Sequence, residues 1–108
     1  MADFRTIALS FPGATESSHM NHPDFRVAGR IFASLGYPTK SWGMLKLTLE
    51  QQAMFVAIAP DTFKPVKGGW GRRGATNVLL QNAGARILKK ALREAWANVA
   101  AKRGSTIK

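Results

Sequence analysis

The chain has 108 residues, of which 45% are hydrophobic, with no cysteine and a formal net charge of +10. This length is that of one domain, so we expect residues 1–108 to form a single domain. The lack of cysteine excludes disulfides, a thiolate nucleophile and cysteine-based metal centres. The sequence has no apolar run of about 18 residues and no basic-then-apolar leader, which predicts a cytoplasmic protein without a membrane span.

The positive charge lies in the C-terminal part of the chain. Residues 1–61 contain five cations and five acids, whereas residues 62–108 contain eleven cations and one acid, Glu94. A one-sided positive field attracts polyanions and raises the rate at which they are encountered. The same charge also keeps a small protein in solution, so charge alone does not distinguish binding from solubility.

The first residues predict a helix. Apolar side chains recur at helical spacing from Phe4 to Phe11, Pro12 and Gly13 follow, and Asp3 is placed to cap the first turn. We therefore expect a helix at about residues 3–10. The polar segment 15–18 fits either a strand or an extended loop.

Strands are expected in the middle of the chain. Two β-rich runs flank Ala28 and Gly29 in the segment 25–35, which predicts a hairpin because glycine suits the positive φ of a tight turn. Alternation places Phe25 and Val27 on one face of this hairpin and Arg26 on the other. A further strand is expected at 42–48. Its two faces are formed by Leu45 with Leu47, and by Trp42 with Met44 and Lys46.

A second helix, a strand and a long final helix follow. Thr48 and Gln51 form a capping-box pattern and Pro60 comes later, which predicts a helix at about residues 49–58. The apolar side of that helix is expected to be formed by Ala53, Val56 and Ala57. Residues 75–80 predict a strand, and residues 84–102 the final helix, with Gly104 as its stop. The apolar stripe of the final helix consists of Leu88, Ala91, Leu92, Ala95 and Val99.

This order of elements predicts an α+β domain. We expect one antiparallel sheet of about five strands, with the helices packed mainly on one face.

Several segments resemble the MmcQ/YjbR family of small bacterial proteins, and together they cover nearly the whole chain. They are Leu9-Ser-Phe-Pro-Gly13, Glu16, His22–Ala33, the Lys46 strand, the Phe63-Lys-Pro65 turn, Gly69–Thr76 and Ala95-Trp96. The resemblance implies a CyaY-like (frataxin-like) fold and a double-wing DNA-binding role, without catalytic residues to carry over. An iron-donor role, by analogy with frataxin, is not expected, because it needs clustered carboxylates and the six acids are scattered.

The segment 64–74 is the first candidate site, because it combines four cations, four glycines and a tryptophan. Its cations, Lys64, Lys67, Arg72 and Arg73, can neutralise phosphates, and its glycines allow backbone amides to approach an anion. Trp70 can stack on an unpaired base. The alternative is a structural loop whose tryptophan packs over the core.

Two further basic surfaces are candidates. Arg26 and Arg30 near the tip of the hairpin are placed to form a wing that enters a DNA groove; the alternative is an ordinary hairpin with solvated arginines. The final helix carries Arg86, Lys89, Lys90 and Arg93 away from its apolar stripe. We assign Arg86, Lys90 and Arg93 to the site as contacts to a phosphate backbone. The alternative is a solvated face opposite the core.

No constellation indicates catalysis, a cofactor or a metal. His19 and His22 lie outside any helical pattern and precede Pro23, so we expect a local hydrogen bond at this turn rather than metal binding. We therefore expect a DNA-binding protein and not an enzyme, with oligomeric state left open. The alternative is a small interaction module whose cations hold an acidic protein or peptide, with Trp70 as the anchor. A binder of small anions is a third possibility.

Overall fold

The strands form one antiparallel sheet of six in the computed structural model, which describes residues 3–36 and 39–106. The strand order is β1-β2-β3-β4-β6-β5, and every neighbouring pair is antiparallel. The strands are β1 (Thr15–His19), β2 (His22–Val27), β3 (Arg30–Leu35), β4 (Trp42–Lys46), β5 (Phe63–Pro65) and β6 (Ala75–Leu79). The helices are α1 (Phe4–Leu9), α2 (Leu49–Ile58), α3 (Gly69–Arg72), the 3-10 turn η1 (Leu80–Asn82) and α4 (Ala85–Thr106).

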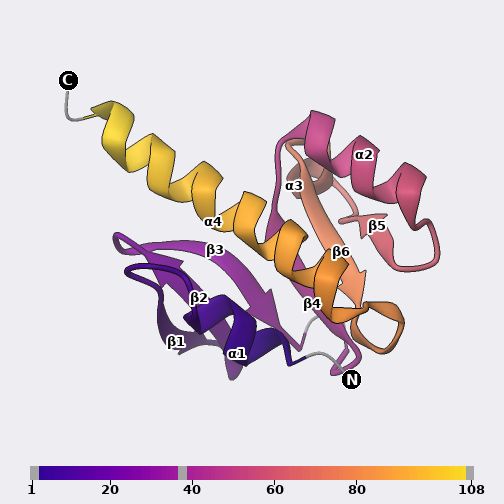
Figure 1. Ribbon diagram of the computed structural model, residues 1–108, viewed down its shortest axis with the longest axis horizontal. Helices are drawn as coiled ribbons and strands as arrows, with labels where there is room; N and C mark the ends of the chain where they lie inside the picture. The colour runs from indigo at the N-terminus through magenta and orange to yellow at the C-terminus, as the bar shows by residue number, and fades with distance from the viewer. Residues whose placement is uncertain (1–2, 37–38, 107–108) are drawn as a thin grey trace.

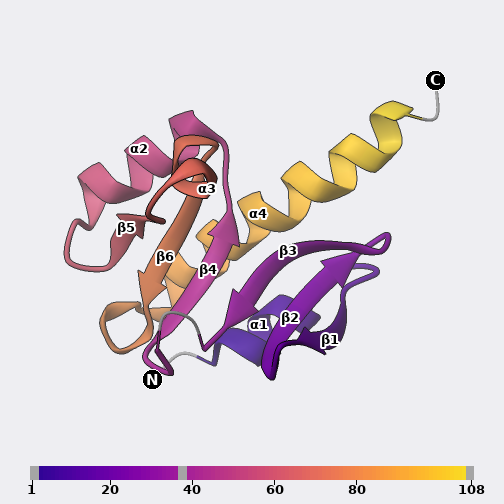
Figure 2. The same ribbon diagram turned by 180° about the vertical axis from the view of Figure 1, so that it is seen from behind.

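The two faces of the sheet differ. Helix α4 crosses one face with α1 beside it, and α2 and α3 lie at the end formed by β5 and β6 (Figure 1). Seen from the other side, the sheet lies in front of α4 and α1 (Figure 2). We call the two sides the covered face and the open face. The α+β class, with helices mainly on one face of an antiparallel sheet, is confirmed.

The core lies between the covered face and α4. Phe25, Phe32, Leu45, Phe63 and Val78 from the strands are fully buried, as is most of the stripe predicted for α4 (Leu88, Ala91, Leu92, Ala95 and, at 7% exposure, Val99). Burying each of the larger side chains contributes roughly 1.5–3 kcal/mol. Helix α1 approaches β4 closely, since a Cβ at Gly43 would lie 2.7 Å from the Phe4 ring.

Elements with local sequence signals are where they were predicted. Asp3 caps α1 by accepting from the Thr6 amide. Thr48 and Gln51 form the capping box of α2. Ala28 and Gly29 have positive φ at the tip of the β2–β3 hairpin. The segment 15–18, for which two interpretations were open, belongs to a strand.

The buried side of α2 was predicted wrongly at two of three positions, since only Val56 packs against the core. Ala53 and Ala57 are exposed, and Gln52 and Phe55 are buried instead. The Phe55 ring packs on Phe63 at a centroid distance of 5.1 Å, which buries more apolar area than two methyl groups would.

Three other details differ from prediction. Phe63–Pro65 is a short edge strand rather than a turn, which adds a sixth strand; proline is tolerated there because an edge strand leaves amide positions unpaired. The segment 64–74 contains the short helix α3 rather than only loop. Helix α4 continues past Gly104 to Thr106, since a glycine inside a helix costs only about 1 kcal/mol relative to alanine.

Candidate nucleic-acid interface

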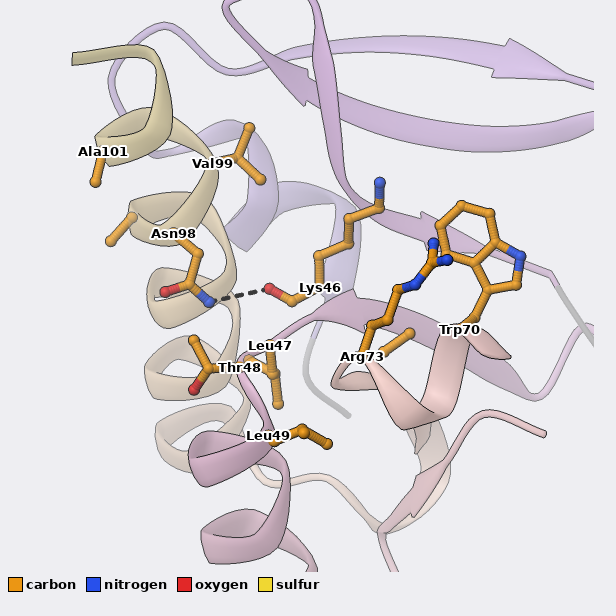
Figure 3. Close-up of a pocket in the computed structure, with 11 residues that line it drawn as sticks. Lys46, Leu47, Thr48, Leu49, Trp70, Arg73, Asn98, Val99 and Ala101 are labelled. Atoms are coloured by element: carbon orange, nitrogen blue, oxygen red, sulfur yellow. Dashed lines mark hydrogen bonds between the residues drawn. The ribbon is translucent and has the colours of Figure 1, made fainter. Parts of the chain in front are cut away.

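A cavity of about 830 Å³ opens between α3, the end of β4 and the C-terminal half of α4 (Figure 3). Its wall is formed by Lys46, Leu47, Thr48, Leu49, Trp70, Arg73, Ala75, Ala97, Asn98, Val99 and Ala101. We call this cavity the Lys46–Trp70 groove. It brings together two of the predicted site residues, Trp70 and Arg73, and adds Lys46 and Asn98, which had not been assigned to the site.

Trp70 is neither packed in the core nor isolated in solvent. Its side chain is 59% exposed, and the Lys46 ammonium lies 5.3 Å from the ring centroid. A cation over an indole face at an exposed position contributes about 0.5–1 kcal/mol. This contact places an aromatic face and a positive charge next to one another on the open side of β4. Alternation had placed Lys46 on one strand face with Trp42 and Met44, but no local signal links Lys46 to residue 70.

The glycines of the segment 64–74 have a packing role. A Cβ at Gly71 would overlap the Val66 carbonyl, and one at Gly74, where φ is +112°, would overlap the Leu47 carbonyl. Gln52 Nε2 donates to the carbonyls of Gly71 (3.0 Å) and Ala75 (2.9 Å). These contacts fix α3 against α2 and the end of β4, and so fix the position of Trp70.

The opposite wall of the groove is held by a hydrogen-bond network. Asn98 Nδ2 donates to the Lys46 carbonyl (3.1 Å) and to Gln51 Oε1 (2.7 Å). Gln51 Nε2 donates in turn to Glu94 (2.9 Å). The network joins α4 to β4 and α2, so the two walls of the groove are parts of one packed unit.

The other cations of the segment 64–74 lie outside this groove. Arg72 borders a separate shallow hollow with Pro65 and Val66, of about 520 Å³. Lys64 is exposed on β5, where Nζ donates to the Pro60 carbonyl at 3.4 Å, and Lys67 is exposed ahead of α3.

The two arginines of the β2–β3 hairpin lie on opposite faces of the sheet. Arg26 Nε donates to Asp24 Oδ1 at 2.8 Å and Arg26 Nη2 donates to Oδ2 at 3.1 Å, on the open face. Arg30 pairs in register with the buried Val27, which places it on the covered face. The charge of Arg26 is therefore already matched within the sheet, and the hairpin does not present both arginines on one surface.

Asp24 is a buried carboxylate that accepts three hydrogen bonds. Besides the two from Arg26, His19 Nδ1 donates to Oδ2 at 2.8 Å, because an ionised carboxylate only accepts. The hydrogen bonds from Arg26, and secondarily from His19, hold the pKa of Asp24 below its ordinary value, although burial acts in the opposite direction. The local role expected for a histidine at this turn is thus taken by His19.

Four cations in the first half of α4 face away from the sheet. Arg86, Lys90 and Arg93 are exposed, as is Lys89, and all lie opposite the buried stripe. The predicted site residues therefore divide between two sides of the molecule: the groove and β5 on one, and the solvent side of α4 on the other.

The YjbR family model matches residues 9–98 of the chain. The protein belongs to the YjbR family. The crystal structure of Deinococcus radiodurans protein DR2400, of domain family DUF419, has a similar fold, with a TM-score of 0.70 and 19% identity. The match covers 86% of this chain and 72% of that one. The search of curated protein sequences found no significant match.

The family match spans the parts of this YjbR protein that build the groove on β4, α3 and α4 as far as Asn98. Across residues 3–36 and 39–106 no helix is long and apolar enough to cross a membrane. Within the same ranges no three histidine or acidic side chains gather closely enough to hold a metal ion.

Proposed function

We propose that this YjbR protein binds nucleic acid, DNA in the first instance, without catalysing a reaction on it. The observation that carries the proposal is the contact between Lys46 and Trp70 in a groove that Arg73 also lines. The two cations can neutralise backbone phosphates, and the exposed indole can stack on a base or pack against a sugar. Base stacking on an aromatic side chain is worth about 1–3 kcal/mol per base.

The charge distribution supports the same proposal. The net charge of +10 and the excess of cations after residue 61 attract a polyanion from a distance, and the groove then provides short-range contacts. The exposed cations of α4 and Arg30 contribute to this long-range attraction from the other side of the molecule.

The test is fluorescence anisotropy with labelled DNA, single-stranded and duplex, over about 50–200 mM salt. We expect binding that weakens steeply with salt. Arg73→Glu is expected to weaken it about tenfold or more, because the substitution replaces an attraction at the groove by a repulsion. Arg93→Glu, which makes the same charge change on the solvent side of α4, is the matched control and should have the smaller effect. No binding at low salt, or equal losses in the two variants, would contradict the proposal.

A second candidate is an acidic peptide or protein partner, which the apolar wall of the groove favours. Leu47, Leu49 and Val99 line the groove beside its cations. Such a surface suits apolar anchor residues with acidic neighbours. Affinity capture before and after nuclease treatment separates the two candidates: partners that persist without nucleic acid, together with no direct binding of purified DNA, would favour the protein partner.

A further inference from the structure

The open face of the sheet carries a row of residues that runs across all six strands. Opposed residues in a sheet lie on the same face, and the register aligns Ser17, Asp24, Ser34, Met44, Asn77 and Lys64 in sequence. Only Met44 in this row is apolar, whereas the covered face is built from residues such as Phe25, Leu45 and Val78. Asp24 and Ser34 are buried and separate the exposed Ser17, on β1, from the other end of the row. The continuous accessible part of the row is therefore on β4, β6 and β5.

Two tryptophans flank this accessible part. Trp42 lies one step along β4 from Met44 on the same face, opposite Leu79, and is partly exposed. At the other end of β4, Trp70 lies over Lys46. Positions 42 and 46 are four steps apart along the strand, or about 13 Å at ~3.3 Å per residue. The third tryptophan, Trp96, donates to the Pro12 carbonyl and stacks on Phe11, away from this face.

The strands present no uncompensated negative charge on the open face. Glu16 and Asp24 are the only acids in the six strands. Glu16 lies opposite the buried Phe25, on the covered face, and accepts from Arg5 Nε at 3.0 Å. Asp24 is buried and accepts from Arg26 and His19. The accessible part thus combines two aromatic rings with Lys46, Lys64 and, at its rim, Arg73. The positive charge of these three side chains is complementary to phosphates.

The width of the sheet decides which form of nucleic acid this face fits. Six strands at ~4.8 Å spacing extend about 24 Å, whereas the major groove of B-DNA is about 12 Å wide. The strands β4, β6 and β5 are part of this continuous sheet and cannot enter a groove alone. A duplex also keeps its base faces stacked and unavailable to tryptophan, whereas a single strand exposes them.

We propose that the open face binds a single strand of nucleic acid across β4, β6 and β5, with Trp70 and Trp42 as two stacking positions. The proposal rests on the nucleic-acid-binding function proposed above and specifies its ligand. The bases stack at the two tryptophans, and Lys46, Lys64 and Arg73 contact the backbone between and beside them.

The first experiment measures anisotropy with labelled oligothymidine of about 12 nucleotides, in competition with an unlabelled hairpin duplex. We expect the oligothymidine to bind more tightly than the duplex. Trp42→Ala should weaken oligothymidine binding about fivefold or more, while Trp42→Phe, which keeps an aromatic face, should restore most of it. Tighter binding of the duplex, or full affinity in Trp42→Ala, would overturn the proposal.

A second pair of variants guards against misfolding of Trp42→Ala. Asn77→Asp places one negative charge on the accessible row at nearly constant volume, and Gln81→Glu makes the same change in η1, beyond the open face. We expect Asn77→Asp to weaken oligothymidine binding several-fold and Gln81→Glu to change it by less than about twofold. Equal effects would overturn the proposal.

If Arg73→Glu lowers binding while the Trp42 and Asn77 variants do not, the inference fails and the proposed function stands; if no nucleic acid binds at all, both fail.

Discussion

The Lys46 ammonium lies 5.3 Å from the ring centroid of Trp70, which joins the end of β4 to α3. The two residues are far apart in the sequence, yet Gln52 donates to the Gly71 carbonyl of α3 and Asn98 donates to the Lys46 carbonyl of β4. These two hydrogen bonds hold in place the backbone segments that carry the two side chains.

The first prediction concerns Lys46→Met, which keeps the alkyl stem and removes the charge. We expect the free energy of unfolding to fall by about 0.5–1 kcal/mol through loss of the cation–π contact. For DNA binding, the slope of log K against log salt should decrease by about one, because one phosphate contact is lost. Urea unfolding and a salt titration measure the two effects.

The control for Lys46→Met is Lys89→Met, which removes the same charge from the exposed side of α4. It should leave the salt slope nearly unchanged. A slope that decreases equally in both variants would show that charge, and not position in the groove, determines binding.

The second prediction concerns Gly74→Ala. Gly74 has a φ of +112°, and a Cβ there would overlap the Leu47 carbonyl, which is backbone and cannot turn aside. Positive φ alone costs a non-glycine residue about 1–3 kcal/mol, so we expect a loss of roughly 2 kcal/mol or more in the free energy of unfolding.

Gly69→Ala is its matched control. No atom lies within 4 Å of a Cβ at Gly69, which begins α3. This change should be neutral or should stabilise the protein by up to about 1 kcal/mol, because alanine restricts the unfolded chain. If both variants unfold at the same urea concentration, Gly74 does not pack closely against the Leu47 carbonyl.

The parts of the fold that could be predicted are those whose signals are local. Asp3, the capping box of Thr48 and Gln51, and the Ala28-Gly29 turn each act on residues at most a few positions away. Each of these features could be predicted from sequence because the residues that interact lie within a few positions of one another.

The details that could not be predicted depend on partners distant in sequence. The Gln52 side chain is buried because its acceptors, 19 and 23 residues away, come from α3 and β6. Lys46 belongs to the site because it contacts Trp70. Arg30 lies on the covered face because it pairs with Val27, next to a register shift between Phe25 and Arg26. Periodicity identifies which residues share a face of one element, but does not show which other element covers that face.

The third prediction concerns acid stability through Asp24. Its pKa is lowered in the folded state, chiefly by the hydrogen bond from Arg26. The unfolded chain therefore binds a proton at higher pH than the folded chain does. The stability contributed by this carboxylate is fully present above its unfolded pKa of about 3.9, and is lost as pH falls through the lower folded value.

We expect Asp24→Asn to reduce the free energy of unfolding at pH 7 by roughly 2–3 kcal/mol, since it breaks a buried, hydrogen-bonded ion pair. The variant should also lose less stability than the parent protein between pH 5 and pH 3 (about one unit on either side of the unfolded pKa). Glu16→Gln, which removes the more exposed pair with Arg5, should cost at most about 1 kcal/mol. Parallel acid curves for the parent and Asp24→Asn would contradict the assignment.

The last prediction tests whether Gln52 positions Trp70. Gln52→Met preserves side-chain length but removes the side-chain donor to the carbonyls of Gly71 and Ala75, which keep their backbone donors. Each lost hydrogen bond should cost about 0.5–1.5 kcal/mol. Because those carbonyls flank the end of α3, amide exchange should accelerate in residues 66–76 more than in the buried part of α4. DNA affinity should fall as well, since a looser α3 must be ordered again on binding.

The control is Gln81→Met, on an exposed side chain, which should change neither exchange nor affinity. Uniform acceleration of exchange across the sheet and α4 would instead show that Gln52 contributes only to global stability.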